Sequence, residues 1–418
     1  MLMVEKNSNK ERRYNIFGVL FILYMLLFSK DTLMFGTNSN TIIKNIGYAI
    51  SFLLCILLVA YSVIYKVQIE KNSILVAAAF ILLAIMTMVA NLEFSVKYFY
   101  EIMTFITILI VVNILSFDKF VICYCKVMFF LAVFSLITYF ISIIFYPALK
   151  ICPTIVNTNG LKYYSCIFSN IQYKEPYIQN RNYGFAREPG VFGVYLIFAL
   201  IFLIGVDKLQ IKSKLKYAVT LVAAVVTTFS TAAYITLICV SLFYLVYSNN
   251  GKLSTKIISI AVVLTFTVIL LTNDYIFNSV FKKLHIKNSS TDSRVNSIIV
   301  DTYILFLNAK NVLLGCGYEF IENNFQEISF NIGFYAEANT NTILKQAAVH
   351  GIAFGILFLI FLIKSIHVNW ANREKLKTTV LFIIVLLVLS NEDFSFNAFL
   401  FSLIFYGTKY NGGSNESV

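Results

Sequence analysis

The chain has 418 residues, of which 59% are hydrophobic and only 13% are charged. This composition, with a mean hydropathy of +0.79, excludes an ordinary soluble domain and is typical of an integral membrane protein. The formal net charge of +12 comes largely from Lys and Arg between apolar segments, so it indicates the charge bias of a membrane protein rather than a nucleic-acid-binding patch.

Apolar segments recur along the chain, and a helix of about 20 residues crosses a hydrocarbon core of about 30 Å. Irregular backbone cannot face lipid, so these segments are predicted to be helical. The sequence therefore predicts an all-α integral membrane protein with about twelve transmembrane helices. The candidate spans lie at 15–34, 42–65, 73–91, 98–116, 121–146, 190–206, 217–230, 232–248, 255–272, 340–363, 378–391 and 394–408.

Basic residues mark alternate connections between these spans. Lys6, Lys10, Arg12 and Arg13 precede the first span, and further Lys and Arg lie in the even-numbered turns, whereas the odd-numbered short turns are nearly bare. Positive charge is retained on the cytoplasmic side, so both termini are predicted to be cytoplasmic. The N-terminus runs into a full-length span without a cleavage site, which predicts a retained first helix rather than a signal peptide.

This topology divides the chain into three membrane regions and two long outer-face loops. The membrane regions are 1–146, 190–272 and 340–408, the loops are 147–189 and 273–339, and residues 409–418 form a predicted disordered tail. All four prolines lie in the first loop. This loop is therefore predicted to be ordered and rich in turns rather than helical.

A charged segment, Arg181 to Gly190, directly precedes the span at 190–206. The planar guanidinium groups of Arg181 and Arg187 suit phosphate oxygens, which makes both residues candidates for binding a lipid phosphate. The alternative is that Arg187 anchors the chain at the membrane surface and Glu188-Pro189 simply starts a helix.

The second loop is predicted to contain an amphipathic helix that lies on the membrane surface. Asp292 or Ser290 is a plausible N-cap, and Arg294 lies in the first turn. Arg is unfavourable near the positive end of a helix unless an anion is close, so Arg294 is a third candidate for anion binding. Apolar spacing continues the helix through Val295, Ile298, Ile299, Thr302 and Phe306, and Gly315-Cys316-Gly317 is predicted to end it in a tight turn.

Carboxylate and amide groups occupy the outer mouth of the span at 340–363. Glu337, Asn339 and Asn341 could hold sugar hydroxyls, or they could cap the helix that follows.

Cysteine and histidine spacing predicts no metal site. Cys152 and Cys166 share the first loop and could form a disulfide in an oxidising compartment, which the sequence leaves open. His350 lies inside a span, where it is either a helix–helix hydrogen-bonding residue or a functional group.

Several of these motifs occur together in one known family. They are Arg181-x-x-Gly184-Phe185-x-x-Glu188-Pro189 before a span, Ser230-Thr231 at a tight turn, Asp292-Ser-Arg294 followed by Asn311-x-x-x-Gly315-x-Gly317, and Asn341 opening a helix that continues to Gly351. In order and topology they resemble the O-antigen polymerase and O-antigen ligase superfamily of C-type glycosyltransferases. The resemblance covers residues 180–356, less than half of the chain.

The resemblance implies inverting glycosyl transfer at the outer face of a bacterial inner membrane, on glycans carried by undecaprenyl pyrophosphate. Arg181, Arg187, Arg294 and Asn341 would bind substrate, and Glu188 or Glu337 would serve as general base. No metal or other cofactor is implied. The expected partners are the lipid-linked donor and acceptor, membrane lipid and a chain-length regulator protein.

Two alternatives have different signatures. An O-antigen ligase of this superfamily usually carries His before the Asn that opens the helix, whereas Thr340 precedes Asn341 here, which favours a polymerase. A lipid-linked oligosaccharide flippase would place charged residues inside helices around a cavity and would have short loops on both faces.

Overall fold

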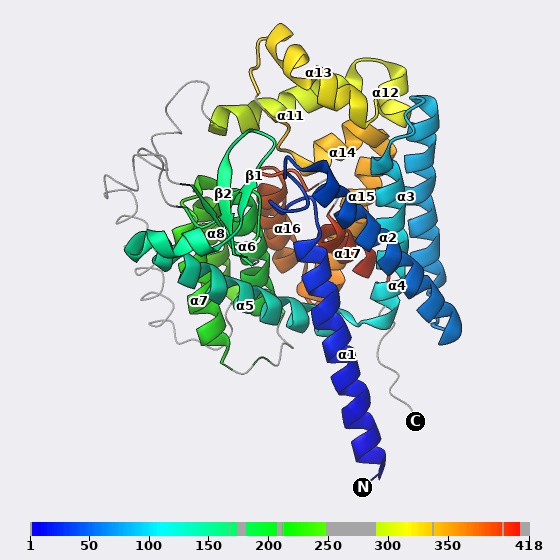
Figure 1. The fold of residues 1–418 in the computed structure, drawn as a ribbon. Helices are drawn as coiled ribbons and strands as arrows, with labels where there is room; N and C mark the ends of the chain where they lie inside the picture. Colours follow the sequence, from blue (N-terminus) through cyan, green and yellow to red (C-terminus); the bar gives the residue numbers. More distant parts are fainter. Residues whose placement is uncertain are drawn as a thin grey trace. The chain divides into compact units, whose positions relative to one another are not determined.

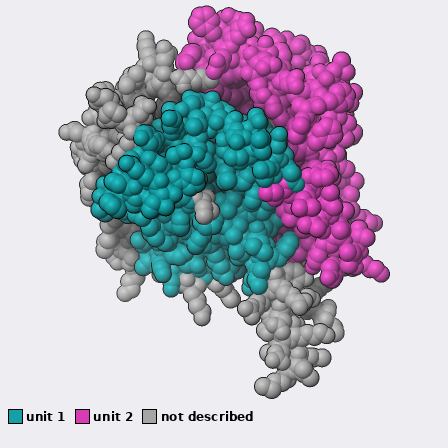
Figure 2. Space-filling model, viewed as in Figure 1, with its two compact units in different colours: residues 1–49, 118–289 teal, residues 50–117, 290–418 magenta. Residues whose placement is uncertain are grey.

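A computed structural model of the protein describes residues 2–166, 168–173, 181–206, 211, 213–247, 290–336, 338–394 and 397–409. The described chain is mostly helical, with one small sheet (Figure 1). It divides into two compact units, coloured separately in Figure 2. Unit 1 comprises residues 1–49 and 118–289, and unit 2 comprises residues 50–117 and 290–418, so each unit combines two distant stretches of sequence.

Five helices among the described residues are long and apolar enough to cross a membrane. They are α2 (Thr41–Ile64), α3 (Lys71–Ala90), α4 (Val96–Ile114), α5 (Phe117–Ile144) and the stretch Ile352–Trp370, which joins α15 (Ile352–Ser365) to the π-helical η4 (Ile366–Trp370). These helices expose many large apolar side chains, among them Ile64 and Leu75, as expected for surfaces that face lipid. The protein is therefore a largely helical, multi-pass membrane protein. The predicted span at 255–272 lies outside the described residues.

Unit 1 contains α1 (Leu2–Leu27), most of α5, and the helices α6 (Pro189–Gly205), α7 (Lys214–Thr227) and α8 (Thr231–Tyr247). Helix α6 packs against both α7 and α8, and the Tyr124 hydroxyl of α5 donates to the α6 carbonyl of Tyr195 at 2.8 Å. All residues of α6 except Ile204 are buried. A helix that is apolar on every face is expected to lie inside a protein or a membrane, and α6 is the central helix of this unit.

The first predicted outer loop contains a sheet, so the expectation of an all-α protein is incomplete. After η1 (Tyr146–Ile151), three short strands, β1 (Thr154–Val156), β2 (Lys162–Ser165) and β3 (Asn170–Gln172), pair antiparallel in the order β1-β2-β3. β-branched and aromatic residues favour this pairing. The β1–β2 turn is closed by the Asn157 side chain, which accepts the Leu161 amide at 2.8 Å, and by Gly160 at φ +79°.

The segment between α1 and α2 lies along this sheet. The Ser39 amide donates to the Val156 carbonyl at 2.8 Å, and the Thr158 amide donates to the Thr37 carbonyl at 2.7 Å. Leu33 shares a small apolar core with Tyr163 and Tyr183. The α1–α2 connection and the loop after α5 are therefore on the same end of unit 1.

Unit 2 is built around an aromatic core. Helix α3 packs against α4, and both α4 and α15 pack against α17 (Ala398–Tyr406), while α16 (Lys375–Leu389) packs against η4. The ring centroid of Phe80 lies 4.9 Å from that of Phe354, and Phe105 lies at the same distance from Phe401, both edge to face. Such pairs stabilise a core beyond the area that they bury.

The described part of the second predicted outer loop forms three helices: α11 (Ser290–Phe306), α12 (Ala309–Leu314) and α13 (Tyr318–Asn331). The predicted amphipathic helix is α11. Its buried face is formed by Ser297, Val300, Asp301 and Ile304, whereas the apolar residues of the predicted stripe, Val295, Ile299 and Phe306, are exposed. The sequence pattern therefore identified the face that does not pack on protein. Helix α11 also ends earlier than predicted, because Asn308 caps a separate helix, α12.

The predicted span at 340–363 is two helices, α14 (Thr342–His350) and α15, broken at Gly351 with φ +91°. Gly315-Cys316-Gly317 closes the break, because the amides of Cys316 and Gly317 donate to the carbonyls of Ala348 and Val349 at 2.9 and 3.1 Å. A Cβ atom on Gly315 would lie 1.9 Å from the Val349 carbonyl oxygen. The Gly-x-Gly motif thus provides hydrogen-bond donors for backbone carbonyls at the end of α14, where the helix is broken.

Candidate functional site

The Arg181 segment of unit 1 lies on the turn between α7 and α8. Arg181 donates from Nε to the Thr228 carbonyl at 3.0 Å and from Nη2 to the Phe229 carbonyl at 2.9 Å. The neighbouring Asn182 amide donates to the Thr227 carbonyl at 2.9 Å. A cation is favourable at this position, because the carbonyl end of a helix carries partial negative charge. The structure therefore brings together two motifs that are about fifty residues apart in sequence.

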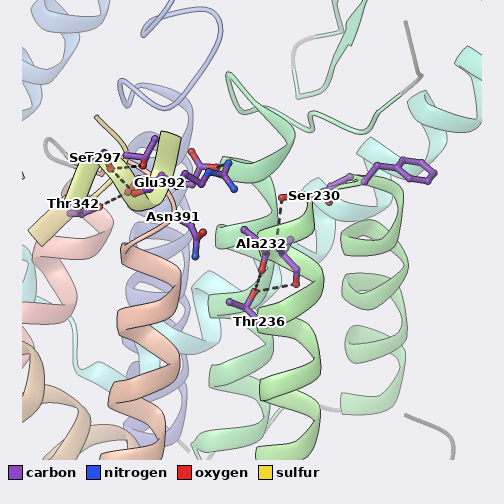
Figure 3. Close-up of polar contacts among 12 residues, drawn as sticks. Ser230, Ala232, Thr236, Ser297, Thr342, Asn391 and Glu392 are labelled. Carbon is purple, nitrogen blue, oxygen red and sulfur yellow. Dashed lines mark hydrogen bonds and ion pairs between the residues drawn. The ribbon is translucent and has the colours of Figure 1, made fainter. Parts of the chain in front are cut away.

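The α7–α8 turn is itself well ordered by hydrogen bonds. Helix α7 ends at Thr227 and α8 begins at Thr231, as the predicted tight turn requires. Ser230 accepts the Ala233 amide at 3.4 Å, and the Thr236 hydroxyl donates to the Ala232 carbonyl at 2.9 Å (Figure 3). Beside the carbonyls that Arg181 contacts, the Thr228 hydroxyl donates to the Val225 carbonyl at 2.7 Å and accepts the Ser230 amide at 3.3 Å.

Arg187 and Glu188 lie at the start of α6. The Arg187 amide donates to the Asp31 carbonyl at 2.7 Å, and the Asp31 carboxylate accepts the Tyr195 hydroxyl at 2.7 Å. Glu188 is the N-cap residue of α6, with Pro189 in the first turn, so Glu188-Pro189 does start a helix. The Glu188 side chain is exposed and makes no capping hydrogen bond.

Gly184 allows the chain to turn toward α6. Its φ is +49°, and a Cβ atom there would lie 2.5 Å from the Phe192 ring. Any L side chain would be strained and would displace Phe192, which is fully buried. The glycine of the sequence motif is thus explained by packing rather than by ligand contact.

Arg294 of unit 2 forms an ion pair with Glu392 at 3.0 Å, and their side chains are 21% and 5% exposed. The Thr342 hydroxyl donates to the Glu392 carbonyl at 2.6 Å and accepts the Phe394 amide at 3.0 Å. Ser297, labelled in Figure 3, also lies within hydrogen-bonding distance of Thr340, with their hydroxyl oxygens 3.0 Å apart. The first turns of α11 and α14 therefore both contact the 391–394 turn. Arg294 lies on α11, and its ion-pair partner Glu392 lies in that turn.

Asn341 is the N-cap of α14. Its side-chain oxygen accepts the Leu344 amide at 2.8 Å, and the residue is 6% exposed. The structure thus gives Asn341 the capping role, and its predicted contact with substrate stays a prediction. Glu337, the second candidate base, lies outside the described residues.

Sequence reasoning missed several charged groups beside Asn341. Lys345 forms an ion pair with Asp393 at 2.6 Å, and the Asn339 amide donates to the Asp301 carboxyl. Burial raises the pKa of Asp301 well above its ordinary value, since this carboxyl group is completely enclosed. Glu392 and Asp393 could have been noticed, because they are carboxylates between two apolar spans. Their partners could not be identified from local sequence.

Cys152 and Cys166 are both free thiols that pack against one cluster of Leu149, Tyr164 and Ile171. Burial, followed by a hydrogen bond with Cys152, raises the pKa of the Cys166 thiol to about 12. The described residues contain no group of three or more His, Cys, Asp or Glu side chains that could hold a metal ion.

The two units differ in the chemistry they offer. In unit 1 the Arg181 guanidinium group bonds to backbone carbonyls and Glu188 is exposed, whereas in unit 2 Arg294 and Lys345 are paired with carboxylates. Guanidinium groups can stabilise a phosphate, and an exposed carboxylate can accept a proton. None of the family models, curated proteins or solved structures compared with this chain matches it. The functional assignment therefore depends on the residues themselves.

Proposed function

We propose that this protein polymerises undecaprenyl-pyrophosphate-linked oligosaccharide repeat units at the outer face of a bacterial inner membrane. The observation that carries the proposal is the pairwise meeting of the family-like motifs within each unit. Arg181 donates to the carbonyls of Thr228 and Phe229, directly before Ser230-Thr231 in the α7–α8 turn, and Arg294 contacts the 391–394 turn onto which the helix capped by Asn341 is fixed. These residues would otherwise have no local reason to be adjacent.

The reaction is an inverting glycosyl transfer. A hydroxyl oxygen of the incoming repeat unit attacks the anomeric carbon of the growing glycan, and the bond from that carbon to the lipid pyrophosphate breaks. The pyrophosphate leaves with the electron pair, and guanidinium groups stabilise its developing charge. The candidates are Arg181 and Arg187 in unit 1 and, taken separately, Arg294 in unit 2. Glu188, exposed at the start of α6, accepts the proton of the attacking hydroxyl.

The proposed topology has about twelve spans and cytoplasmic termini, and the contacts within each unit support it. The connections predicted to be outside contact one another: the Asn91 side chain donates to the Gly315 carbonyl at 3.2 Å, and Lys97 pairs with Glu322. The predicted cytoplasmic ends of two spans also meet, because the hydroxyl oxygens of Ser73 and Thr408 lie 2.6 Å apart. No such contact joins a predicted outer turn to a predicted cytoplasmic one among the described hydrogen bonds and ion pairs.

A flippase remains the second candidate, because Glu101 and His350 are buried within helices α4 and α14. Charged groups inside helices are what a transporter of lipid-linked oligosaccharides requires. A ligase is disfavoured by Thr340, which stands where such enzymes usually carry His.

Deletion of the gene, followed by electrophoresis of surface polysaccharide, separates the candidates. Loss of a polymerase leaves lipid A core capped by single repeat units, whereas loss of a flippase or ligase leaves bare core. Complementation with the intact gene should restore long chains. Bare core in the deletion strain would contradict the polymerase assignment.

A further inference from the structure

Two cysteines of unit 1 lie opposite each other at one end of the small sheet. Strands β1 and β2 pair antiparallel, and the last listed partner at this end of β1 is Thr154. The same register continues one step further, because the Ser165 amide donates to the Pro153 carbonyl at 2.9 Å. The next step of this register places Cys152 opposite Cys166.

The backbone hydrogen bonds identify the kind of pair that the cysteines form. In an antiparallel ladder, hydrogen-bonded and non-hydrogen-bonded pairs alternate, and the preceding step is a hydrogen-bonded one. The cysteine amides accordingly donate elsewhere, that of Cys152 to the Leu149 carbonyl at 3.0 Å and that of Cys166 to the Ser169 carbonyl at 2.8 Å. The Cα atoms of a non-hydrogen-bonded pair lie about 4.5 Å apart, within the range of about 4.4–6.8 Å that a disulfide spans.

The two side chains also share one environment. Both cysteines pack against the apolar cluster of Leu149, Tyr164 and Ile171. Cys166 follows Tyr164 by two residues, and side chains two apart along a strand lie on the same face. The Cys166 thiol is hydrogen-bonded to that of Cys152. A bond between the two sulfurs would therefore replace a contact that they already make.

The sheet that carries this pair supports the Arg181 segment. The Asn170 amide of β3 donates to the Gly184 carbonyl at 2.7 Å, and the Tyr183 hydroxyl donates to Oε1 of Gln172, also in β3, at 2.6 Å. Strand β3 pairs in turn with β2, which ends directly before Cys166. The position of the Arg181 segment thus depends on how firmly the sheet is held.

We propose that Cys152 and Cys166 form a disulfide that joins the end of η1 to the end of β2 and so fixes the sheet that supports the Arg181 segment. In the topology of the proposed function, on which this disulfide depends, the loop lies on the outer, oxidising side. The oxidant is a protein disulfide of that compartment. One cysteine attacks it and releases one of its thiols, and the second cysteine displaces the other. The S–S bond forms while two electrons and two protons pass to the oxidant.

The surroundings of the pair make this disulfide a structural bond. Burial, followed by the hydrogen bond with Cys152, raises the pKa of the Cys166 thiol to about 12. The thiolate is the reactive form, and a sulfur whose thiol has a raised pKa is also a poor leaving group. Exchange is therefore slow in both directions once the side chains pack on their cluster. The bond forms before β2 packs and persists afterwards.

Peptide mass spectrometry tests the pair directly. Trypsin cleaves after lysine and separates the two cysteines into the peptides 151–162 and 163–174, each of which contains one cysteine. Membranes that contain the full chain are treated with iodoacetamide in denaturant and digested without reduction. We expect the two peptides to be joined, and to separate when a reductant is added. In the matched control Cys152→Ser, the peptide 163–174 should carry the alkyl group instead.

Unlinked, alkylated peptides from wild-type membranes would overturn the proposal. A phosphatase reporter inserted at Gly160, in the exposed β1–β2 turn, then separates the two causes. An active reporter would mean that the loop is outside and that the pairing is wrong, which leaves the proposed function untouched. An inactive reporter would place the loop in the cytoplasm and would contradict the topology of the proposed function itself.

Thermal unfolding of the full chain in detergent tests the effect of the disulfide. Cys152→Ser, Cys166→Ser and the double variant remove the same bond, so all three should lower the melting temperature by a similar amount. A reductant should lower that of the wild type to the same level and leave the double variant unchanged. Cys239→Ser, partly buried on α8, is the control and should stay near the wild type. Losses that add between the single variants would indicate two independent thiols and would overturn the proposal.

Discussion

The charged segment before α6 in unit 1 and the first turn of α11 in unit 2 both contain arginine, yet the partners of these arginines differ. Arg181 in unit 1 donates to two backbone carbonyls at the end of α7, whereas Arg294 in unit 2 donates to the carboxylate of Glu392. Removing Arg181 would expose the end of a helix. Removing Arg294 would leave a buried carboxylate, so similar substitutions should fail for different physical reasons.

The largest effect is expected from the exposed carboxylate of unit 1. Replacement of Glu188 by Gln preserves size but removes the ability to accept a proton, and losing a general base lowers the rate by about 10²–10⁴. Polymerisation of a lipid-linked repeat unit by purified protein in bilayers measures this rate. Since the Glu188 side chain makes no capping bond, the melting temperature of the Glu188→Gln variant should stay near that of the wild type. Glu337→Gln is the matched variant, and normal products from both would favour a mechanism that depends on arginine alone.

Arg294→Ala should come next. Breaking a buried ion pair from one side destabilises a protein by about 3–5 kcal/mol, and the lower end applies here because the Arg294 side chain is 21% exposed. Thermal unfolding in detergent measures the loss. The double variant Arg294→Ala/Glu392→Gln should recover much of the stability without restoring long polysaccharide chains. Recovery of both would show that Arg294 acts only on Glu392.

Arg181→Lys should have a smaller effect on stability. Lysine keeps the charge but cannot donate to two carbonyls in the fixed fork of a guanidinium group, and such a hydrogen bond contributes about 1.5–3 kcal/mol. The rate of polymerisation should fall by about 10²–10³ if the same group also contacts pyrophosphate. A variant with lowered melting temperature and wild-type rate would assign Arg181 to structure alone.

The pH dependence of unit 2 should contain a contribution from Asp301. Burial raises its pKa well above the value of about 3.9 expected in the unfolded chain, so its contribution is fully present below the unfolded pKa and is lost as pH rises through the folded pKa. Asp301→Asn should therefore weaken the fall in melting temperature on the alkaline side. Asp292→Asn, on the same helix but only half-buried, is the control. Parallel pH profiles for wild type and Asp301→Asn would contradict this expectation.

Much of the helical architecture could be predicted, because a span is a local property of composition. The predicted span at 98–116 corresponds to α4 at Val96–Ile114, and the helix expected near Arg294 is α11. The sheet was missed because its strands have only three or four residues, too short for a pattern of alternation. The break at Gly351 was missed because a single glycine is tolerated in a helix, and its cause lies in the distant Gly315–Gly317 turn.

The candidate site was only half predictable for a related reason. Arginines and carboxylates at the ends of apolar segments are visible in sequence, and Arg181, Arg187, Glu188 and Arg294 were found in that way. Their partners are not visible, because Arg294 and Glu392 are 98 residues apart and meet only after folding. The Glu101–His350 contact is hidden for the same reason, since the two residues lie on α4 and α14, which are far apart in sequence.

The burial of α6 has a consequence for how the protein is made. This helix contains no charged residue and would enter the bilayer readily, yet nearly all of its side chains end up against protein. During synthesis α6 emerges before α7 and α8, the two helices that later cover it, so its early environment is lipid and its final one is protein. Insertion and packing are therefore separate events for α6. A chain truncated after Gly205 should leave α6 inserted but accessible to a lipid-borne crosslinker, and extension through Tyr247 should remove that accessibility.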